Sequence, residues 1–307
     1  MIYTLTLNPA IDYVVTMNQL IEGNVNRTTT EKFYVGGKGI NVSQLLNEHQ
    51  IENIALGFIS GFTGLFIENS LHEKGMKTDF IQLKEGTSRI NLKAKTNSTE
   101  TEINGLGPVI DEEELKNLFL KLEALEQDDI LVLAGSLAKG LSENFYAQIM
   151  EKLKDKKIRI VVDSTKNALL MTLKYRPFLI KPNHHEIAEL FNVEIKTQEE
   201  LLQYGQELKK MGAQNVLISM GGEGAILLTE DNEVYQSNVP KGTVKNSVGA
   251  GDSMVAGFIA GYIKTNQYEE ALRMGAASGS ATAFSSDLAT KSLIDDLIKE
   301  IKIKKIV

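Results

Sequence analysis

The segment from Asn246 to Ile259 carries the residues best suited to chemistry in this chain. A glycine-rich turn there delivers one carboxylate, Asp252, to the start of an apolar helix. Glycine accepts positive φ and lets phosphate oxygens approach the backbone. The N–H groups of Gly249, Ala250 and Gly251 would lie where a helix dipole is positive and can hold a transferring phosphate. Because Asp252 can take a proton from an attacking hydroxyl, the pattern predicts a phosphoryl-transfer site. An ordinary helix N-terminus would also fit this segment alone.

A second glycine cluster, from Val35 to Ser43, opens another predicted helix and suits a phosphorylated polyol. The small residues Gly37 and Gly39 let backbone N–H groups meet sugar hydroxyls. Asn41 can donate and accept hydrogen bonds, and Lys38 supplies a point charge for a phosphate. Neither a Walker A loop nor a G-x-G-x-x-G dinucleotide fingerprint occurs in the chain. A flexible helix start with a solvated lysine is the alternative interpretation.

Three further residues could bind a sugar phosphate. Arg27 and Arg89 lie on two segments of strand-like alternation, where a guanidinium could grip a phosphate with two hydrogen bonds. Asp12 follows a strand and the turn-forming Asn8-Pro9 pair, and it can bind two sugar hydroxyls. Taken singly, each also fits a solvated strand residue or a turn carboxylate.

Two motifs suit the nucleotide side of such a reaction. Lys181-Pro-Asn-His-His-Glu186 ends a strand and opens a helix, so Asn183 and Glu186 could orient a magnesium-bound water shell. The same pair also matches a helix capping box. The run from Ser219 to Gly224 follows another strand and would let the backbone approach a nucleotide, although a hairpin turn would read similarly.

The elements that must position these residues alternate between strand and helix, which predicts an α/β fold with a mostly parallel sheet flanked by helices. The predicted buried strands are residues 2–7, 53–59, 130–134, 158–163, 178–180 and 216–220. The predicted helices are residues 39–47, 64–74, 112–126, 142–154, 184–191, 199–211, 250–263 and 268–284. Loops at the carboxyl ends of the strands should carry the site.

Residues 11–35 and 87–103 do not follow this alternation of strands and helices. Alternation such as Arg-Ile-Asn-Leu-Lys-Ala-Lys over residues 89–95 predicts half-buried antiparallel strands. The two pieces would form one small, discontinuous β-sheet lid. We therefore expect a lid of residues 11–35 and 87–103 over an α/β core of residues 1–10, 36–86 and 104–307.

Composition excludes several classes of function. The 307 residues carry a net charge of −7, which argues against a nucleic-acid partner. There is no cysteine, so disulfides, iron–sulfur clusters and thiol nucleophiles are excluded. The four histidines show no metal-ligand spacing. No apolar run is long enough for a membrane span, so the expectation is a cytoplasmic protein without a membrane partner.

Four motifs together carry a family resemblance: residues 36–41, 181–186, 219–224 and 246–259. In this order and at these separations they resemble the ribokinase-like (PfkB) carbohydrate kinases over nearly the whole chain. Five segments look like the branch that phosphorylates fructose 1-phosphate, with tagatose-6-phosphate kinases as near neighbours: residues 6–12, 36–43, 89–91, 100–104 and 246–253. One departure lies in the loop of residues 135–140, where relatives often have proline in place of Ala138.

The resemblance implies ATP as donor, Mg²⁺ as helper and fructose 1,6-bisphosphate as product. It implies Asp252 as base, with an anion hole of Gly249, Ala250 and Gly251. The implied sugar-phosphate ligands are Asp12, Arg27, Gly37, Lys38, Gly39, Asn41, Arg89, Asn91 and Ser136. The implied ATP ligands are Lys181, Asn183, Ser219, Gly221, Gly224 and Gly251. Glu186 would hold the metal through water.

Other functions remain open at this point. The acceptor could be tagatose 6-phosphate or fructose 6-phosphate, or the chain could be a non-catalytic sugar-phosphate sensor on the same fold. Exposed lid edges also suggest pairing of two copies, so a homodimer through the lid is expected.

Overall fold

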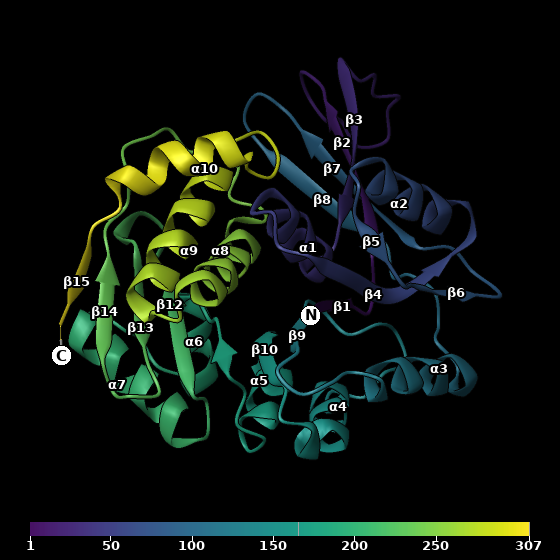
Figure 1. Cartoon of the computed structure of the whole chain (residues 1–307). Coiled ribbons are helices and arrows are strands. Elements are labelled where there is room, and N and C mark those ends of the chain that lie inside the picture. The colour runs from purple at the N-terminus through teal and green to yellow at the C-terminus, as the bar shows by residue number, and fades with distance from the viewer. Residues whose placement is uncertain (165, 307) are drawn as a thin grey trace.

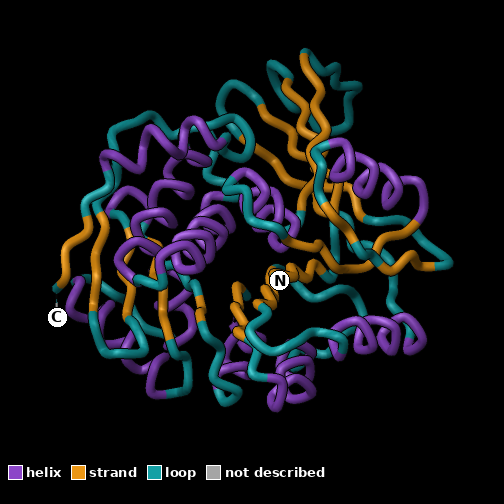
Figure 2. Tube along the Cα trace, viewed as in Figure 1, coloured by secondary structure: helices purple, strands orange, loops and turns teal. Residues whose placement is uncertain are grey.

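A large, mostly parallel sheet forms the centre of the molecule (Figures 1 and 2). This computed structural model describes residues 1–164 and 166–306. The strand order is β15-β14-β13-β12-β11-β10-β9-β1-β4-β5, with β6 beside β4. The bounds are β1 Ile2–Thr6, β4 Asn53–Ser60, β5 Lys77–Thr78, β6 Ile81–Leu83, β9 Ile130–Ala134, β10 Arg159–Asp163, β11 Leu179–Ile180, β12 Asn215–Ser219, β13 Ala225–Leu228, β14 Val234–Ser237 and β15 Ile303–Lys305.

Helices cover both faces of this sheet because its central strands are apolar on both sides. In β9, Leu131 and Leu133 pack into one buried cluster, whereas Ile130, Val132 and Ala134 pack into another. The first cluster takes helices α3 Glu112–Glu123, α4 Phe145–Leu153, α5 Lys166–Leu173, α6 His184–Phe191 and α7 Gln198–Lys210. The second takes α1 Lys38–Glu48, α8 Ala250–Thr265, α9 Tyr268–Ala283 and α10 Lys291–Leu297.

A separate small sheet stands beside the large one, in the order β3-β2-β7-β8 (Figure 1). We call it the small sheet: β2 Ala10–Thr16, β3 Thr30–Gly36, β7 Arg89–Lys95 and β8 Glu100–Asn104. Helix α2 (Gly61–Glu73) packs Ile67 and Leu71 against Ile11 of β2. Register places Asp12 and Asn91 on one face and Tyr13 and Leu92 on the other. One face is therefore polar and the other apolar.

The strand prediction was wrong at the centre of the small sheet. Antiparallel pairing was expected, and it holds for β2 with β3 and for β7 with β8, but β2 and β7 are parallel. Alternation has the same period in both kinds of pairing, so it does not reveal direction. A crossover through α1, β4 and α2 separates β3 from β7, and a connection of this length lets β7 pair with the other side of β2 in the parallel direction.

Each predicted strand of the large sheet and each predicted helix is present, with ends shifted by up to about three residues. The prediction omitted β5, β6, the β13–β14 hairpin, β15, α5 and α10. These elements are short, and α5 and α10 span only two turns, too few for a helical period to stand out. No helix within residues 1–164 and 166–306 is both long and apolar enough to cross a membrane.

A buried histidine at the end of α1 leads to a first prediction. His49 is 5 % exposed, and its Nε2 lies 2.8 Å from Oγ of Ser278 on α9. Burial, with Lys264 and Lys291 nearby, lowers the pKa of His49 to about 4. The unfolded chain takes up this proton near pH 6.5. Stability should therefore fall as the pH drops from about 6.5 to about 4, by at most about 1.4 kcal/mol per unit.

Urea denaturation of wild type and His49→Gln across this pH range measures the effect. The variant should show a weaker pH dependence of the free energy of unfolding. The matched control is His72→Gln, at an exposed histidine on α2, which should retain the wild-type dependence. Identical curves for wild type and His49→Gln would rule out this role of His49.

Candidate active site

The carboxylate of Asp252 lies in the first turn of α8, where that helix meets α1. Asp252 is 6 % exposed, and its Oδ2 accepts a hydrogen bond of 2.8 Å from Nδ2 of Asn41. The residue before the helix, Gly249, has a φ of 80°, a conformation that glycine adopts readily. The turn therefore forms as its residue types predict, and it holds one buried carboxylate at a helix N-terminus.

The three predicted anion-hole amides differ in their partners. The N–H of Ala250 donates to the carbonyl of Ser247 at 3.3 Å. In the part of the chain that the structure describes, the N–H groups of Gly249 and Gly251 donate no hydrogen bond. A Cβ on Gly251 would lie 3.1 Å from Nζ of Lys181, so this glycine keeps the ammonium close to the turn. Two amides and a cation are thus available beside Asp252.

A buried carboxylate that the sequence analysis missed, Asp163, joins two lysines at this point. It ends β10 and is 1 % exposed. Its Oδ1 lies 3.2 Å from Nζ of Lys38 and 3.6 Å from Nζ of Lys181. Its Oδ2 is buried with no hydrogen-bond partner among the described residues. The signal available in the sequence was its place at the carboxyl end of a parallel strand.

The charges in this cluster shift one another's pKa values. Burial and the nearby Asp163 raise the pKa of Asp252 to about 6, against the opposing effects of Lys38, Asn41 and Lys181. Burial acts to raise the pKa of Asp163, but Lys181 and Lys38 outweigh it and lower the value. The Asp163 carboxylate raises the pKa of Lys38. Near neutral pH the cluster therefore holds a protonated Lys38, an ionised Asp163 and, in Asp252, a carboxylate able to accept a proton.

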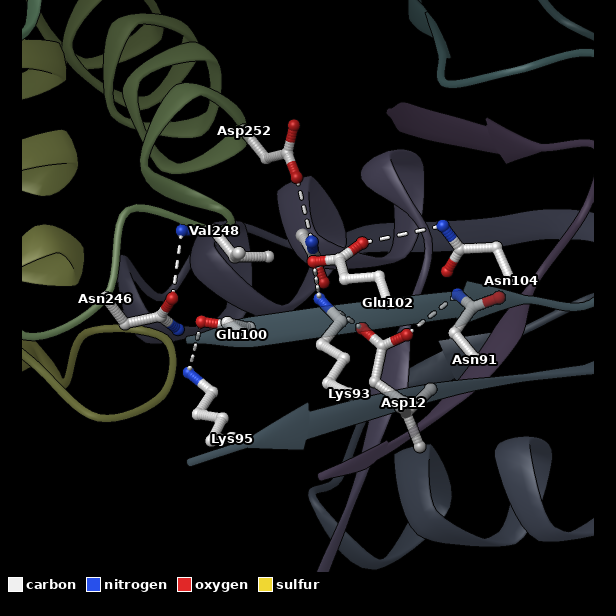
Figure 3. A network of polar contacts seen from close by, with 12 residues as sticks. Asp12, Asn91, Lys93, Lys95, Glu100, Glu102, Asn104, Asn246, Val248 and Asp252 are labelled. Atoms are coloured by element: carbon white, nitrogen blue, oxygen red, sulfur yellow. Dashed lines mark hydrogen bonds and ion pairs between the residues drawn. The ribbon is translucent and has the colours of Figure 1, made fainter. Parts of the chain in front are cut away.

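The polar face of the small sheet forms the opposite wall of the site (Figure 3). Nδ2 of Asn91 donates to Oδ1 of Asp12 at 2.8 Å. A cleft of about 240 Å³ lies between this face and the loop that leads into α8. Its lining includes Asp12, Asn41, Lys93, Asn246 and Val248.

A second cavity, of about 300 Å³, has Lys38 of α1 in its lining. Arg89 and Ser136 line it together with Gly37 and Asn8. Nε of Arg89 donates to the carbonyl of Asn8 at 3.1 Å, which fixes the guanidinium at the rim. The buried oxygen Oδ1 of Asn8 has no partner among the described residues. This cavity presents donors suited to a small anion.

Close packing explains the glycines at the start of α1. Gly37 has a φ of 120°, and a Cβ on Gly39 would lie 2.5 Å from Oγ1 of Thr6. Side chains at these positions would push α1 away from β1, so the glycines keep Lys38 and Asn41 near the site.

The residues predicted for the nucleotide follow β11 and β12, the next two strands along the sheet from β10. Asn183 and Glu186 form a capping box on α6: Oδ1 of Asn183 accepts from the Glu186 N–H, and Oε2 of Glu186 accepts from the Asn183 N–H. The run from Ser219 to Gly224 is the turn between the antiparallel strands β12 and β13. The backbones of Asn183 and Ser219 form an isolated parallel β-bridge. The first motif is therefore a helix capping box and the second a hairpin turn, and the two segments lie side by side.

Arg27 is the predicted site residue that stays apart from the others. It lies in the exposed loop between β2 and β3, and it lines neither cavity. The remaining predicted residues surround the N-termini of α1 and α8 or lie at the carboxyl ends of β11 and β12.

Residues 3–295 match the model of the pfkB family carbohydrate kinases. The chain is 47 % identical to a 1-phosphofructokinase from Bacillus subtilis, covering 100 % of both chains. It is 39 % identical to a D-tagatose-1-phosphate kinase from Bacillus licheniformis, covering 99 % of both. The crystal structure of phosphofructokinase-2 from Escherichia coli with substrates and products superposes with a TM-score of 0.92 at 28 % identity, covering 97 % of this chain and 98 % of that one. This protein therefore belongs to the pfkB family of carbohydrate kinases.

Proposed function

We propose that this protein transfers the γ-phosphoryl group of ATP to fructose 1-phosphate and forms fructose 1,6-bisphosphate. One observation carries the proposal. Asp252 is a buried carboxylate beside two free amides, and its partner Asn41 lines the cleft against the polar face of the small sheet. Lys38 and Lys181 are held nearby on Asp163. The 47 % identity to a protein named 1-phosphofructokinase supports fructose 1-phosphate as the acceptor.

In the proposed reaction, Asp252 accepts the proton of the sugar C6 hydroxyl while that oxygen attacks the γ-phosphorus in line. The bond from the γ-phosphorus to the β–γ bridging oxygen breaks, and ADP leaves. The N–H groups of Gly249 and Gly251 would hold the equatorial oxygens of the transferring group, and Lys38 and Lys181 would balance its charge. The small sheet would close over the cleft and keep water from acting as the acceptor.

We propose that ATP lies along the segments of Lys181–Glu186 and Ser219–Gly224, with Gly251 at its γ-phosphate. Mg²⁺ bound with ATP would neutralise phosphate oxygens. The donor set fits an ion carried mainly by the nucleotide and water, because the described residues hold no cluster of three acidic or histidine side chains. Oε1 of Glu186 accepts no protein hydrogen bond in the described chain and could bind such a water shell.

The acceptor's own phosphate would occupy the cavity of about 300 Å³, where Arg89, Ser136 and Lys38 provide donors. The sugar ring would lie against Asp12, Asn41 and Asn91. A ketose phosphate bound in this way extends from Arg89 to Asp252, with its free primary hydroxyl at the base.

A coupled assay of ADP release tests the substrate assignment. Fructose 1-phosphate, tagatose 1-phosphate, tagatose 6-phosphate, fructose 6-phosphate and fructose are compared by kcat/KM. We expect fructose 1-phosphate to lead by about tenfold or more over the other sugar phosphates. A lead for either tagatose phosphate would reassign the acceptor, and no ADP release with any of them would indicate a sensor.

The fall of kcat/KM on the acid side of its pH profile, the acid limb, should report the protonation of Asp252. With a pKa of about 6, Asp252 loses its ability to accept a proton as the pH falls through that value, so kcat/KM should fall. Asp163→Asn removes the neighbouring anion that raises this pKa, and the limb should move to lower pH. The ionisation of the substrate phosphate is common to both enzymes and cancels from the difference.

Asp129→Asn is the matched control for this shift. Asp129 is also buried, but it pairs with the N-terminal amine at the far end of the strands. The control should keep the wild-type limb whatever it does to stability. An unshifted limb in Asp163→Asn would contradict the assigned coupling.

We also propose a homodimer formed through the small sheet. The edge strands β3 and β8 are largely exposed, and Phe33, Ile90 and Ile103 lie exposed on this sheet. Unpaired edges with apolar side chains favour association. Light scattering after size exclusion should give twice the mass of one chain, and Ile103→Glu should give a monomer. A monomeric wild type at micromolar concentration would contradict the proposal.

A further inference from the structure

Lys93 is a buried lysine whose ammonium makes no hydrogen bond within the described chain. It lies in β7 and is 8 % exposed. Its Nζ is 3.7 Å from Oδ2 of Asp12 and 3.8 Å from Oε1 of Glu102 (Figure 3). Both distances exceed the range of a hydrogen bond. Burial of an ammonium is costly unless its donors are satisfied, so this residue calls for a partner.

The position of Lys93 indicates where that partner would lie. Its side chain lines the cleft of about 240 Å³ together with Asp12 and Asn41, and Asn41 holds Asp252. Asn91 fixes Oδ1 of Asp12, so the other oxygen, Oδ2, is the one nearest Lys93. The Lys93 ammonium and Oδ2 of Asp12 therefore face the same space, on the side of the site that would take the sugar.

The 3.7 Å gap suits one kind of group. An oxygen atom at the apex of this pair can lie within hydrogen-bond distance of both Lys93 and Asp12. It must accept from the ammonium and donate to the carboxylate. A sugar hydroxyl does both, as does the water that it would displace, whereas a carbonyl or ether oxygen cannot donate.

We propose that Lys93 is a further substrate-binding residue that determines specificity, and that it donates to the same sugar hydroxyl that donates to Asp12. This inference rests on the proposed function and adds to it. Lys93 and Asp12 together would select a ketose phosphate with a hydroxyl at one ring position, because loss of that hydroxyl would leave the Lys93 ammonium without a hydrogen-bond acceptor and Oδ2 of Asp12 without a donor.

The neighbouring Lys95 provides a matched control. It is two residues along β7, on the same face, and lines the same cleft. Its side chain is 33 % exposed, and its Nζ lies 3.3 Å from Oε2 of Glu100. Lys95→Met therefore removes the same charge from the same wall, but from a more exposed lysine whose carboxylate partner lies nearer.

The test is a thermodynamic cycle in which the lysine is removed from the protein and one ring hydroxyl is removed from the sugar. Wild type, Lys93→Met and Lys95→Met are assayed with fructose 1-phosphate and with analogues that each lack one ring hydroxyl. Lys93→Met should lower kcat/KM for fructose 1-phosphate roughly 10- to 100-fold, mainly through the KM of the sugar, with the KM of ATP unchanged. With one of the analogues the same substitution should cost less than about threefold. Lys95→Met should act alike on all the sugars.

Two results would overturn the proposal: no loss in Lys93→Met, or an equal loss with every sugar. Thermal melting checks that Lys93→Met folds. If it does not fold, Lys93→Arg is used instead. The larger guanidinium should displace the donor and give the same hydroxyl-dependent loss of kcat/KM. If wild type does not phosphorylate fructose 1-phosphate, the proposed function fails. Calorimetric binding of the same sugars then still measures whether Lys93 and one hydroxyl are coupled.

Discussion

Replacing Asp252 with asparagine should lower kcat roughly 10²- to 10⁴-fold, the usual contribution of a positioned base. Asparagine has the same shape, and its Oδ1 can still accept the hydrogen bond that Nδ2 of Asn41 gives to Asp252. The change removes the proton acceptor and the charge while leaving the helix turn in place. Equilibrium dissociation constants for ATP and fructose 1-phosphate should therefore change little, and the loss should fall on kcat.

Rapid-quench kinetics at saturating substrate measure this loss apart from product release. The control is Asp129→Asn, which removes a buried carboxylate that lies outside the site and should keep its turnover. Near-normal turnover in Asp252→Asn would reject the base assignment.

Replacing Arg89 with alanine should raise the KM for fructose 1-phosphate roughly 10- to 100-fold, because a hydrogen bond to a charged group contributes about 1.5 to 3 kcal/mol. Nε of Arg89 is held by the carbonyl of Asn8, so the rest of the guanidinium can face the cavity that it lines with Ser136. The KM for unphosphorylated fructose should change far less, since fructose has no phosphate to lose contact with.

Arg159→Ala provides the variant control. Arg159 begins β10, at the opposite end from Asp163, and its guanidinium lies over the ring of Phe178. That variant should leave both KM values unchanged. Equal effects of Arg89→Ala on fructose and fructose 1-phosphate would show that Arg89 does not bind the phosphate.

Local signals were enough to predict the parts of the site that one segment builds. The turn before Asp252 needs glycine at a φ of 80°, and the sequence supplies Gly249 there. The capping box of Asn183 and Glu186 depends on residues three apart in one helix turn. Alternation in residues 89–95 indicated a half-buried strand, which β7 confirms.

The parts that depend on contacts between distant segments could not be read in this way. Asp163 belongs to no motif, and it matters because β10 ends where Lys38 and Lys181 converge, 125 and 18 residues away in sequence. Lys93 and Lys95 look equivalent in the alternation of β7. Only the pairing of β7 with β2 and β8 brings Asp12 and Glu102 to Lys93, and that pairing is a property of the folded sheet.

The stoichiometry of products from wild-type enzyme with ATP and fructose 1-phosphate distinguishes phosphoryl transfer to the sugar from hydrolysis of ATP. Phosphorus NMR follows the sugar product while ADP is assayed in the same sample. Phosphoryl transfer to the sugar predicts one fructose 1,6-bisphosphate for each ADP and almost no ADP without the sugar. ADP released at the same rate with and without the sugar, with inorganic phosphate as the other product, would contradict it.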